Sequence, residues 1–179
     1  MKRLSLIIAL LLTLSACGKS SIDGNLYLDN RPEFQLERFF QGDIKAWGIV
    51  QDRSGNLLQQ FEADIIGTFE DGVLTLDETF TYSLGEGVEE RVWTINKEGE
   101  NRYSGSAGDI PSAAGQAYGN AMYWGYEMDL PVGDDVYRVT FEDWIWAVDD
   151  RRIFNRSYVK KFGIVFAEVT IFMEKMTSS

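Results

Sequence analysis

The chain has 179 residues, a length that suits one globular domain. Its formal net charge is −11, and so acidic a surface repels nucleic acid phosphates, which argues against DNA or RNA as a partner. The sequence contains no histidine, which excludes Ser-His-Asp and Cys-His catalysis and most zinc sites. It shows no EF-hand-like spacing either. We therefore assign no catalytic residue, no metal ligand and no cofactor; an acid–base enzyme would have to use carboxylates, tyrosine or lysine, and a hard-cation site made of oxygen ligands stays open.

The N-terminus has the form of a bacterial lipoprotein signal. Lys2 and Arg3 supply positive charge, and residues 4–14 form an apolar run too short to cross a hydrocarbon core of ~30 Å as a helix. Residues 14–17 read Leu-Ser-Ala-Cys, the pattern of a lipobox, and Cys17 is the only cysteine. We expect cleavage before Cys17 and a diacylglycerol on its sulfur, because two acyl chains anchor a protein stably.

These features predict an address in the bacterial cell envelope. Gly18 stands where an aspartate would signal retention in the inner membrane, which favours an outer membrane lipoprotein facing the periplasm. We predict a signal peptide over residues 1–16, a lipidated tether over 17–32 and a single barrel domain over 33–179. The alternative is a buried N-terminal helix carrying an ordinary core cysteine.

The rest of the chain consists of strand-like runs separated by turn signals. Before them, residues 33–41 fit either one or two helical turns or a short strand. Residues 106–119 are rich in alanine and glycine and fit either a loop or close-packed strands. The predicted strands are residues 44–51, 57–68, 73–82, 89–97, 102–107, 120–130, 136–148, 153–161 and 164–176.

Apolar and polar residues alternate along several of these runs. Leu74, Leu76, Phe80 and Tyr82 share one face of their predicted strand. Short connections imply antiparallel neighbours, and eight or more strands leave costly open edges unless the sheet closes. The sequence therefore predicts an all-β fold: an antiparallel up-and-down, lipocalin-like β-barrel, or a strongly curved sheet, with a short N-terminal helical turn.

Two resemblances extend this prediction. Residues 36–48 are similar to the lipocalin opening, in which a helical turn leads through a Gly-x-Trp-like motif into the first strand, although Gly42 and Trp47 are further apart than that motif demands. Nearly the whole chain after Cys17 resembles the bacterial lipoproteins grouped as domain of unknown function 3833. The resemblance implies kinship without an established activity. Members of the family often sit beside fatty-acid-modifying enzymes, which favours a lipid as the ligand. The matching stretches are WGIVQDRSG (47–55), LDETFTY (76–82), RVW (91–93), GNA (119–121), FEDW (141–144), NR (155–156) and KFG (161–163).

Aromatic and charged residues on the strands are the candidates for a binding site. The rings either line a cavity for an apolar ligand or fill an ordinary barrel core. Neighbouring residues on a strand face opposite sides, so we expect one member of a polar pair such as Glu142 and Asp143 to enter the barrel. There it serves as a head-group anchor or in a structural ion pair; the alternative is that these residues form a solvated strand face. The ligand-binding candidates are Glu78, Arg91, Trp93, Trp124, Tyr126, Asp143, Trp144, Asn155 and Arg156.

Three functions fit these predictions. The favoured one is a non-enzymatic, membrane-anchored lipoprotein whose barrel binds an apolar or amphipathic small molecule, a lipid or fatty acid. The second is an enzyme that modifies a lipid in the barrel cavity; a paired-carboxylate hydrolase using Glu78 and Asp143 would rest on residue type alone. The third is an envelope interaction protein with a filled barrel. The expected partners are a membrane, through acylated Cys17, and the lipid ligand.

Overall fold

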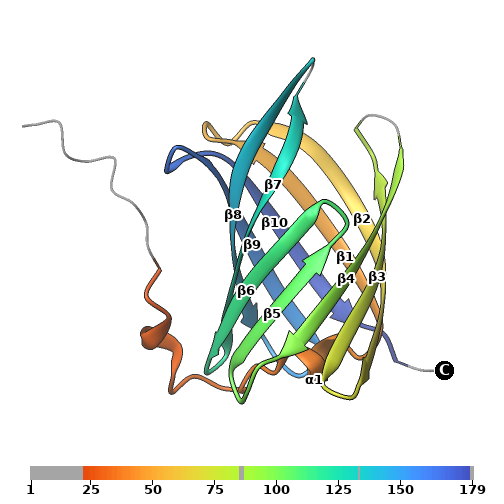
Figure 1. Ribbon diagram of the computed structural model, residues 1–179, viewed down its shortest axis with the longest axis vertical. Coiled ribbons are helices and arrows are strands. Elements are labelled where there is room, and N and C mark those ends of the chain that lie inside the picture. The colour runs from red at the N-terminus through yellow and green to blue at the C-terminus, as the bar shows by residue number, and fades with distance from the viewer. Residues whose placement is uncertain (1–21, 85–86, 133, 178–179) are drawn as a thin grey trace, which may run out of the picture.

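The chain forms a closed antiparallel β-barrel of ten strands (Figure 1). The structure is a computed structural model, and it describes residues 22–84, 87–132 and 134–177. Each strand pairs with the next one along the chain, and β10 pairs with β1 to close the sheet. The predicted up-and-down barrel is confirmed. The strands are β1 Gly42–Asp52, β2 Leu57–Glu70, β3 Val73–Tyr82, β4 Val88–Lys97, β5 Arg102–Ala107, β6 Ile110–Tyr118, β7 Ala121–Val132, β8 Asp135–Ala147, β9 Arg152–Lys161 and β10 Ile164–Lys175.

The predicted strands agree closely with the observed ones. β3 and β5 have the predicted bounds, and the other predicted runs differ from their strands only at the ends. The alanine- and glycine-rich stretch, left open between loop and strand, contains β6. The ambiguous residues 33–41 contain a short helix, α1 Leu36–Phe40.

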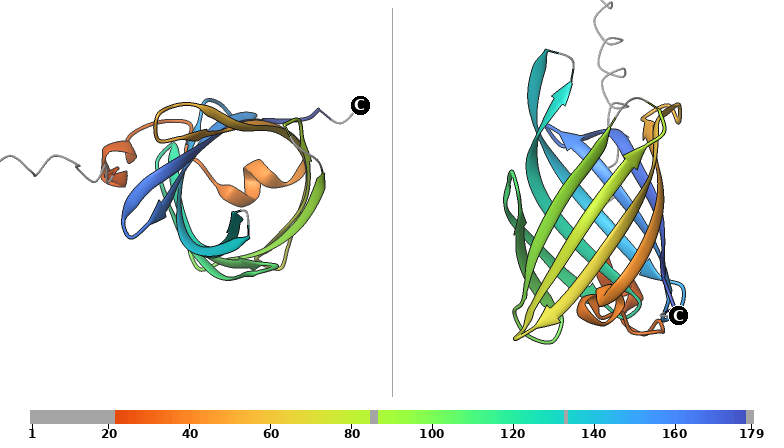
Figure 2. Two further views of the ribbon diagram at one scale, coloured as in Figure 1. Left: turned by 90° about the horizontal axis from the view of Figure 1, so that it is seen from above. Right: turned by 90° about the vertical axis from the view of Figure 1, so that its right-hand side faces the viewer.

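The two ends of the barrel differ. The turns β1–β2, β3–β4, β5–β6, β7–β8 and β9–β10 lie at one end, which we call the open end. The opposite, closed end is covered by α1, which lies across the inside of the barrel (Figure 2). The helix buries Leu36, Phe39 and Phe40. At Gly67 of β2, a Cβ atom would lie 1.6 Å from the carbonyl oxygen of Phe40, so the close approach of helix and strand requires glycine there.

Polar contacts fix α1 in this position. Glu37 accepts a hydrogen bond of 2.8 Å from the Tyr103 hydroxyl and another from the Lys97 ammonium. Burial raises the pKa of Glu37, but the hydrogen bond from Lys97 and the other hydrogen bonds outweigh it, so the pKa lies below its usual value. The Lys175 ammonium donates to the Arg38 carbonyl at 2.9 Å. The helix is therefore tied to β4, β5 and β10.

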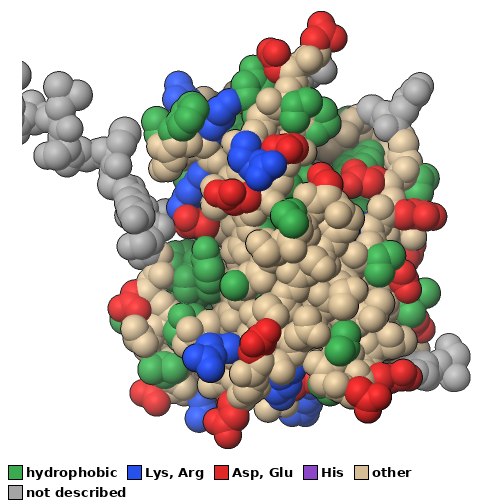
Figure 3. All heavy atoms as spheres, in the orientation of Figure 1, with side chains coloured by type: hydrophobic (Ala, Val, Ile, Leu, Met, Phe, Trp, Pro, Cys, Tyr) green, Lys and Arg blue, Asp and Glu red, His purple; other side chains and the backbone are tan. Residues whose placement is uncertain are grey.

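The interior holds apolar side chains in two clusters. The larger one lies towards the closed end and includes Ile44, Leu74 and Met122, together with the helix side chains. The smaller one lies towards the open end, on β8, β9 and β10, and its buried members are Val139, Val159 and Ala167. On the face shown in Figure 3, acidic, basic and apolar side chains are mixed.

The described part of the predicted tether packs against the outer wall. A 3-10 helix, η1 Gly24–Tyr27, is capped by the Asp23 side chain, which accepts a hydrogen bond from the Asn25 backbone. The ring of Tyr27 lies 6.1 Å from that of Trp144. The predicted signal peptide and Cys17 lie outside the described residues. Within the described ranges, no helix has the length and apolar character needed to span a membrane.

Candidate binding site in the barrel interior

A layer of polar side chains crosses the interior between the two apolar clusters. Glu78 and Arg91 are direct neighbours across β3 and β4, and Asp143 and Ser157 are direct neighbours across β8 and β9. Each of these residues shares its strand face with core residues two positions away, so alternation points all of them inwards. Asp143 acts electrostatically on Glu78, although the two belong to different walls of the barrel.

The polar layer lies in a recess that solvent reaches. Interior-facing residues towards the closed end, such as Leu76 and Ile95, are buried. Interior-facing residues in the polar layer and between it and the open end, including Val50, Glu78 and Asp143, keep part of their surface exposed. Because these side chains point into the barrel, that exposed surface belongs to the inside. We call this space the recess.

Aromatic rings form one wall of the recess. Trp93 meets Trp124 and Tyr126 edge to face, with ring centroids 5.7 and 5.4 Å apart. Tyr126 stacks on Phe141 at 4.9 Å, with the two rings 4° from parallel. Such contacts add about 0.5–1.5 kcal/mol per pair to the burial of the rings.

Small residues make room for these rings. A Cβ atom at Gly115 would lie 2.4 Å from the Trp124 ring, and one at Gly105 would lie 3.1 Å from the far edge of the same ring. Ala113 faces Tyr126 across β6 and β7. The alanine- and glycine-rich segment is therefore the part of the wall against which the large aromatic side chains lie.

Arg91 already has anionic partners. Its guanidinium lies 3.0 Å from the Glu89 carboxylate and 5.5 Å from the centroid of the Phe80 ring. Burial lowers the pKa of Arg91, but the charge of Glu78 and further neighbours outweigh it and raise the pKa above its usual value. The guanidinium is therefore held in its charged form by the protein itself.

The two half-buried carboxyl groups of the polar layer have strongly shifted pKa values. Burial raises the pKa of Glu78 to about 7, against the attraction of Arg91 and with the help of the charge of Asp143. Burial also raises the pKa of Asp143 to about 7, and neither the nearby Ser157 nor Arg91 cancels the effect. Burial raises the pKa of Tyr126 well above its usual value. The recess thus holds carboxyl groups that change charge near neutral pH.

Hydrogen bonds within the layer are incomplete. The Asn155 side-chain amide donates to the Trp144 carbonyl at 3.3 Å and accepts from the Ser157 hydroxyl at 3.2 Å. Both hydrogen bonds are made to residues of the barrel wall. The Oδ1 atom of Asp143 is buried and has no hydrogen-bond partner among the described residues. A buried acceptor without a donor is costly, which marks Asp143 as a position for ligand or solvent.

The structure brings most of the candidate residues together. Interior-facing positions are occupied by Glu78, Arg91, Trp93, Trp124, Tyr126, Asp143 and Asn155. Trp144 and Arg156 do not belong to this group. Each follows an interior residue directly on its strand, so alternation places it outside.

Both outer residues have partners on the outer wall. Trp144 is covered there by Tyr27, Tyr118 and Tyr123. Arg156 donates to the Thr170 hydroxyl at 3.3 Å and lies 3.6 Å from Glu168. The prediction that Trp144 and Arg156 belong to the binding site is therefore not supported by their position, because both lie outside the recess.

Sequence reasoning missed other members of the site. Glu89 lies two residues before Arg91 and Ser157 two residues after Asn155, so strand period alone places both on the interior face. Phe141, which stacks on Tyr126, lies two residues before Asp143 and is likewise absent from the predicted candidates. A spacing of two residues from a candidate on the same strand is therefore the sequence signal that could have identified these residues.

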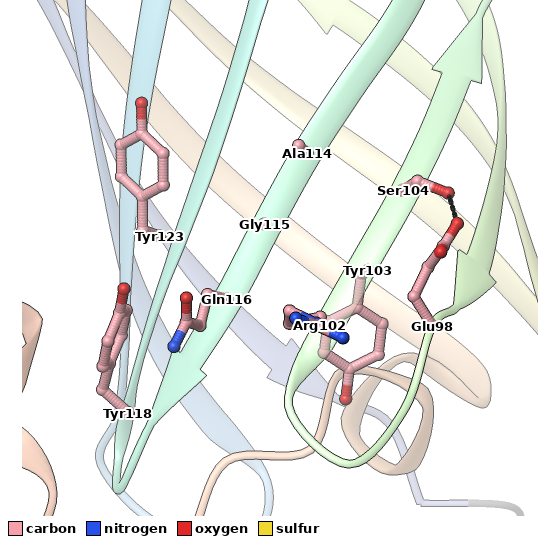
Figure 4. A pocket seen from close by; sticks show the side chains of 9 residues that line it. All are labelled: Glu98, Arg102, Tyr103, Ser104, Ala114, Gly115, Gln116, Tyr118 and Tyr123. Atoms are coloured by element: carbon pink, nitrogen blue, oxygen red, sulfur yellow. Dashed lines mark hydrogen bonds between the residues drawn. The ribbon is translucent and has the colours of Figure 1, made fainter.

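A second hollow lies on the outer wall. It has a volume of about 560 Å³ and is formed by β5, β6 and β7 and the turn before β5 (Figure 4). Its charged side chains, Glu98 and Arg102, are exposed, and Glu98 is engaged by the Ser104 hydroxyl. Small-molecule sites usually enclose most of their ligand, and the exposed lining of this hollow does not favour it as such a site. In the described residues, no group of three or more acidic, cysteine or histidine side chains is placed to hold a metal ion.

The closed antiparallel up-and-down barrel is a lipocalin-like fold. The chain belongs to the family described as "Protein of unknown function (DUF3833)", whose model matches residues 11–175. This confirms the family suggested by the sequence. No curated protein matches the sequence.

Solved structures show the same fold at low sequence identity. The S-type phycobiliprotein lyase CPES from Guillardia theta is 13% identical, with a TM-score of 0.56 over 80% of this chain and 91% of the lyase. A protein of unknown function from the DUF3598 family of Nostoc punctiforme is 12% identical, with a TM-score of 0.58. That likeness covers 82% of this chain and 51% of the other, so the barrel corresponds to about half of the Nostoc protein.

Proposed function

We propose that the protein is a membrane-anchored lipoprotein that binds an amphipathic small molecule of lipid type in the recess. The observation that carries the proposal is the polar layer of Glu78, Arg91 and Asp143 inside a solvent-accessible barrel walled by aromatic rings. Apolar walls with a few converging polar groups are typical of small-molecule sites. The fold shared with a phycobiliprotein lyase supports the same class of function.

The open end carries exposed apolar side chains. Phe162, at the β9–β10 turn, is 93% exposed and has a φ of 52°, a conformation that costs a bulky residue energy. Ile164, Val136, Leu57 and Leu58 are also exposed on strands next to their open-end turns. Exposed apolar clusters of this kind suit contact with lipid or with a partner protein. These side chains support the proposal that the barrel takes up and releases its ligand at a membrane surface.

Binding of a neutral amphiphile tests the proposal directly. Monolauroylglycerol is expected to bind the delipidated protein at micromolar strength, about −8 kcal/mol, and to change the fluorescence of Trp93 and Trp124. Val50→Phe places a ring in the recess and is expected to weaken binding at least tenfold. Ile49→Phe, one residue away on the outer face, is the matched control and is expected to bind normally. Equal binding by both variants, or no binding by the unaltered protein in calorimetry, would contradict the proposal.

Anchoring is tested at Cys17. Cys17→Ser is expected to leave the precursor uncleaved and without covalent lipid, because the thioether to diacylglycerol requires the sulfur. Mass spectrometry of the protein isolated from a bacterial membrane measures both effects. Covalent diacylglycerol on the Cys17→Ser protein would show that the anchor lies elsewhere.

A second candidate function is an enzyme acting on the bound molecule. It is favoured by one observation, the pKa values of about 7 for Glu78 and Asp143, since acid–base catalysis needs groups that exchange protons near neutral pH. Mass spectrometry of the amphiphile after incubation separates the two functions. An unchanged probe supports binding alone, and a hydrolysed probe supports the enzyme.

A further inference from the structure

The charges of the polar layer do not balance. Glu78, Glu89 and Asp143 contribute carboxyl groups, and among the described residues Arg91 is the only cationic side chain in the layer. The other lysines near the interior are engaged elsewhere. Lys97 pairs with Glu37 at the closed end, and Lys161 lies at the open end, 3.6 Å from the centroid of the Tyr137 ring.

The one cation of the layer is already neutralised. Arg91 has Glu89 at 3.0 Å and Glu78 directly across the strand pair, so it gains little from a further anion. Asp143 has no ion pair among the described residues, and its Oδ1 atom has no hydrogen-bond donor. A ligand carboxylate or phosphate would add negative charge beside Glu78 and Asp143, whose pKa values are already raised by burial, and the like charges would repel.

We infer that the recess selects amphiphiles whose head group is a primary amine and discriminates against a free carboxylate or phosphate. The inference rests on the proposed function and narrows its ligand class. It replaces the fatty acid that the sequence suggested. An ammonium group would donate to the Oδ1 atom of Asp143, which has no donor among the described residues, and would add positive charge to a layer whose carboxylates are balanced only in part by Arg91.

The surroundings of the polar layer fit such a head group. The Trp93, Trp124 and Tyr126 rings adjoin the carboxylates, and an ammonium over an aromatic face gains further attraction. The apolar cluster of Val139, Val159 and Ala167 lies between the layer and the open end and is suited to an alkyl chain. The ligand therefore lies with its amine deep in the barrel and its chain towards the open end.

Three probes with the same chain length test the inference. Dodecylamine, dodecanoate and monolauroylglycerol are titrated into the delipidated protein at pH 7.5, below their micellar concentrations, and binding is followed by calorimetry. Dodecylamine is expected to bind at least tenfold more tightly than dodecanoate. Asp143→Asn is expected to reduce this preference to less than threefold. Glu127→Gln, which removes an acid from the exposed outer face of β7, is the matched control and is expected to keep the full preference.

The outcomes separate the inference from the proposed function. Binding of dodecanoate as tight as that of dodecylamine overturns the amine preference while the lipid-binding proposal stands. A failure of all three probes overturns the proposed function itself. If Asp143→Asn does not fold, as judged by circular dichroism, Glu78→Gln serves in its place with the same expected loss. Dodecanoate binding that is tighter than dodecylamine binding and is removed by Arg91→Gln would show that Arg91 is an anion anchor and that the inference is wrong.

Discussion

Replacing Asp143 by asparagine is expected to stabilise the ligand-free protein at pH 8 and to remove much of the pH dependence of its stability. The pKa of Asp143 is raised from 3.8 to about 7 in the folded protein because the carboxyl group is buried. Between these two values the folded state keeps a proton that the unfolded state has lost, so the free energy of unfolding falls as the pH rises. Above pH 7 the buried carboxylate is charged and its full cost is present. Asparagine is neutral throughout.

Thermal unfolding followed by circular dichroism between pH 5.5 and 8.5 measures this effect. The melting temperature of the unaltered protein is expected to fall across the range. At pH 8, Asp143→Asn is expected to melt about 5 °C higher, a gain of about 2 kcal/mol for a protein of this size. Glu127→Gln is expected to follow the unaltered protein. A pH-independent melting temperature, or an Asp143→Asn protein that is less stable at pH 8, would show that Asp143 is not a destabilising buried charge.

A methyl group at position 67 is expected to displace the helix that closes the barrel. The Cβ atom of an alanine there would lie 1.6 Å from the Phe40 carbonyl oxygen, and backbone cannot move aside as the end of a side chain does. The helix must shift together with its buried Leu36, Phe39 and Phe40 side chains. We expect Gly67→Ala to cost about 3 kcal/mol and to lower the melting temperature by roughly 6–12 °C.

The control for Gly67→Ala lies at a turn where space is free. A Cβ atom at Gly55 would meet nothing within 4 Å, and its φ of 84° is one that asparagine tolerates better than most residues. Gly55→Asn is expected to change the melting temperature by only a few degrees. Urea unfolding of the three proteins gives the free energies directly. A Gly67→Ala protein as stable as the unaltered one would mean that α1 is not held against β2 in solution.

The barrel was predictable because strand period and turn signals repeat along the chain. Val73–Tyr82 and Arg102–Ala107 were located to the residue, since apolar alternation ends at glycines or charged turns on either side. The same period placed Arg91 and Trp93 on one face, and both point into the recess. A period of two fixes which residues share a face without any knowledge of the partner strand.

Other features depend on contacts between distant parts of the chain. The Phe34–Phe40 segment has no strong period, and its helix forms because Gly67, Tyr103 and Lys97 offer a place for it inside the closed end. The alanine- and glycine-rich segment makes room for Trp124, a contact that depends on the pairing of β6 with β7. Trp144 is buried as a core residue would be, but under η1 on the outer wall, which composition does not reveal. The convergence of Glu78 and Asp143 likewise depends on barrel closure.

The position of α1 inside the closed end also limits the route by which the proposed ligand can enter and leave the recess. With α1 across that end, the recess communicates with its surroundings through the opposite end, so loading and unloading use the same route in reverse. The proposed ligand would therefore be taken up and returned by the same route, as in a carrier, and would not pass through the barrel from one side to the other. A ligand held head-inwards leaves with its chain first, so whatever receives it must accept the hydrocarbon before the head group.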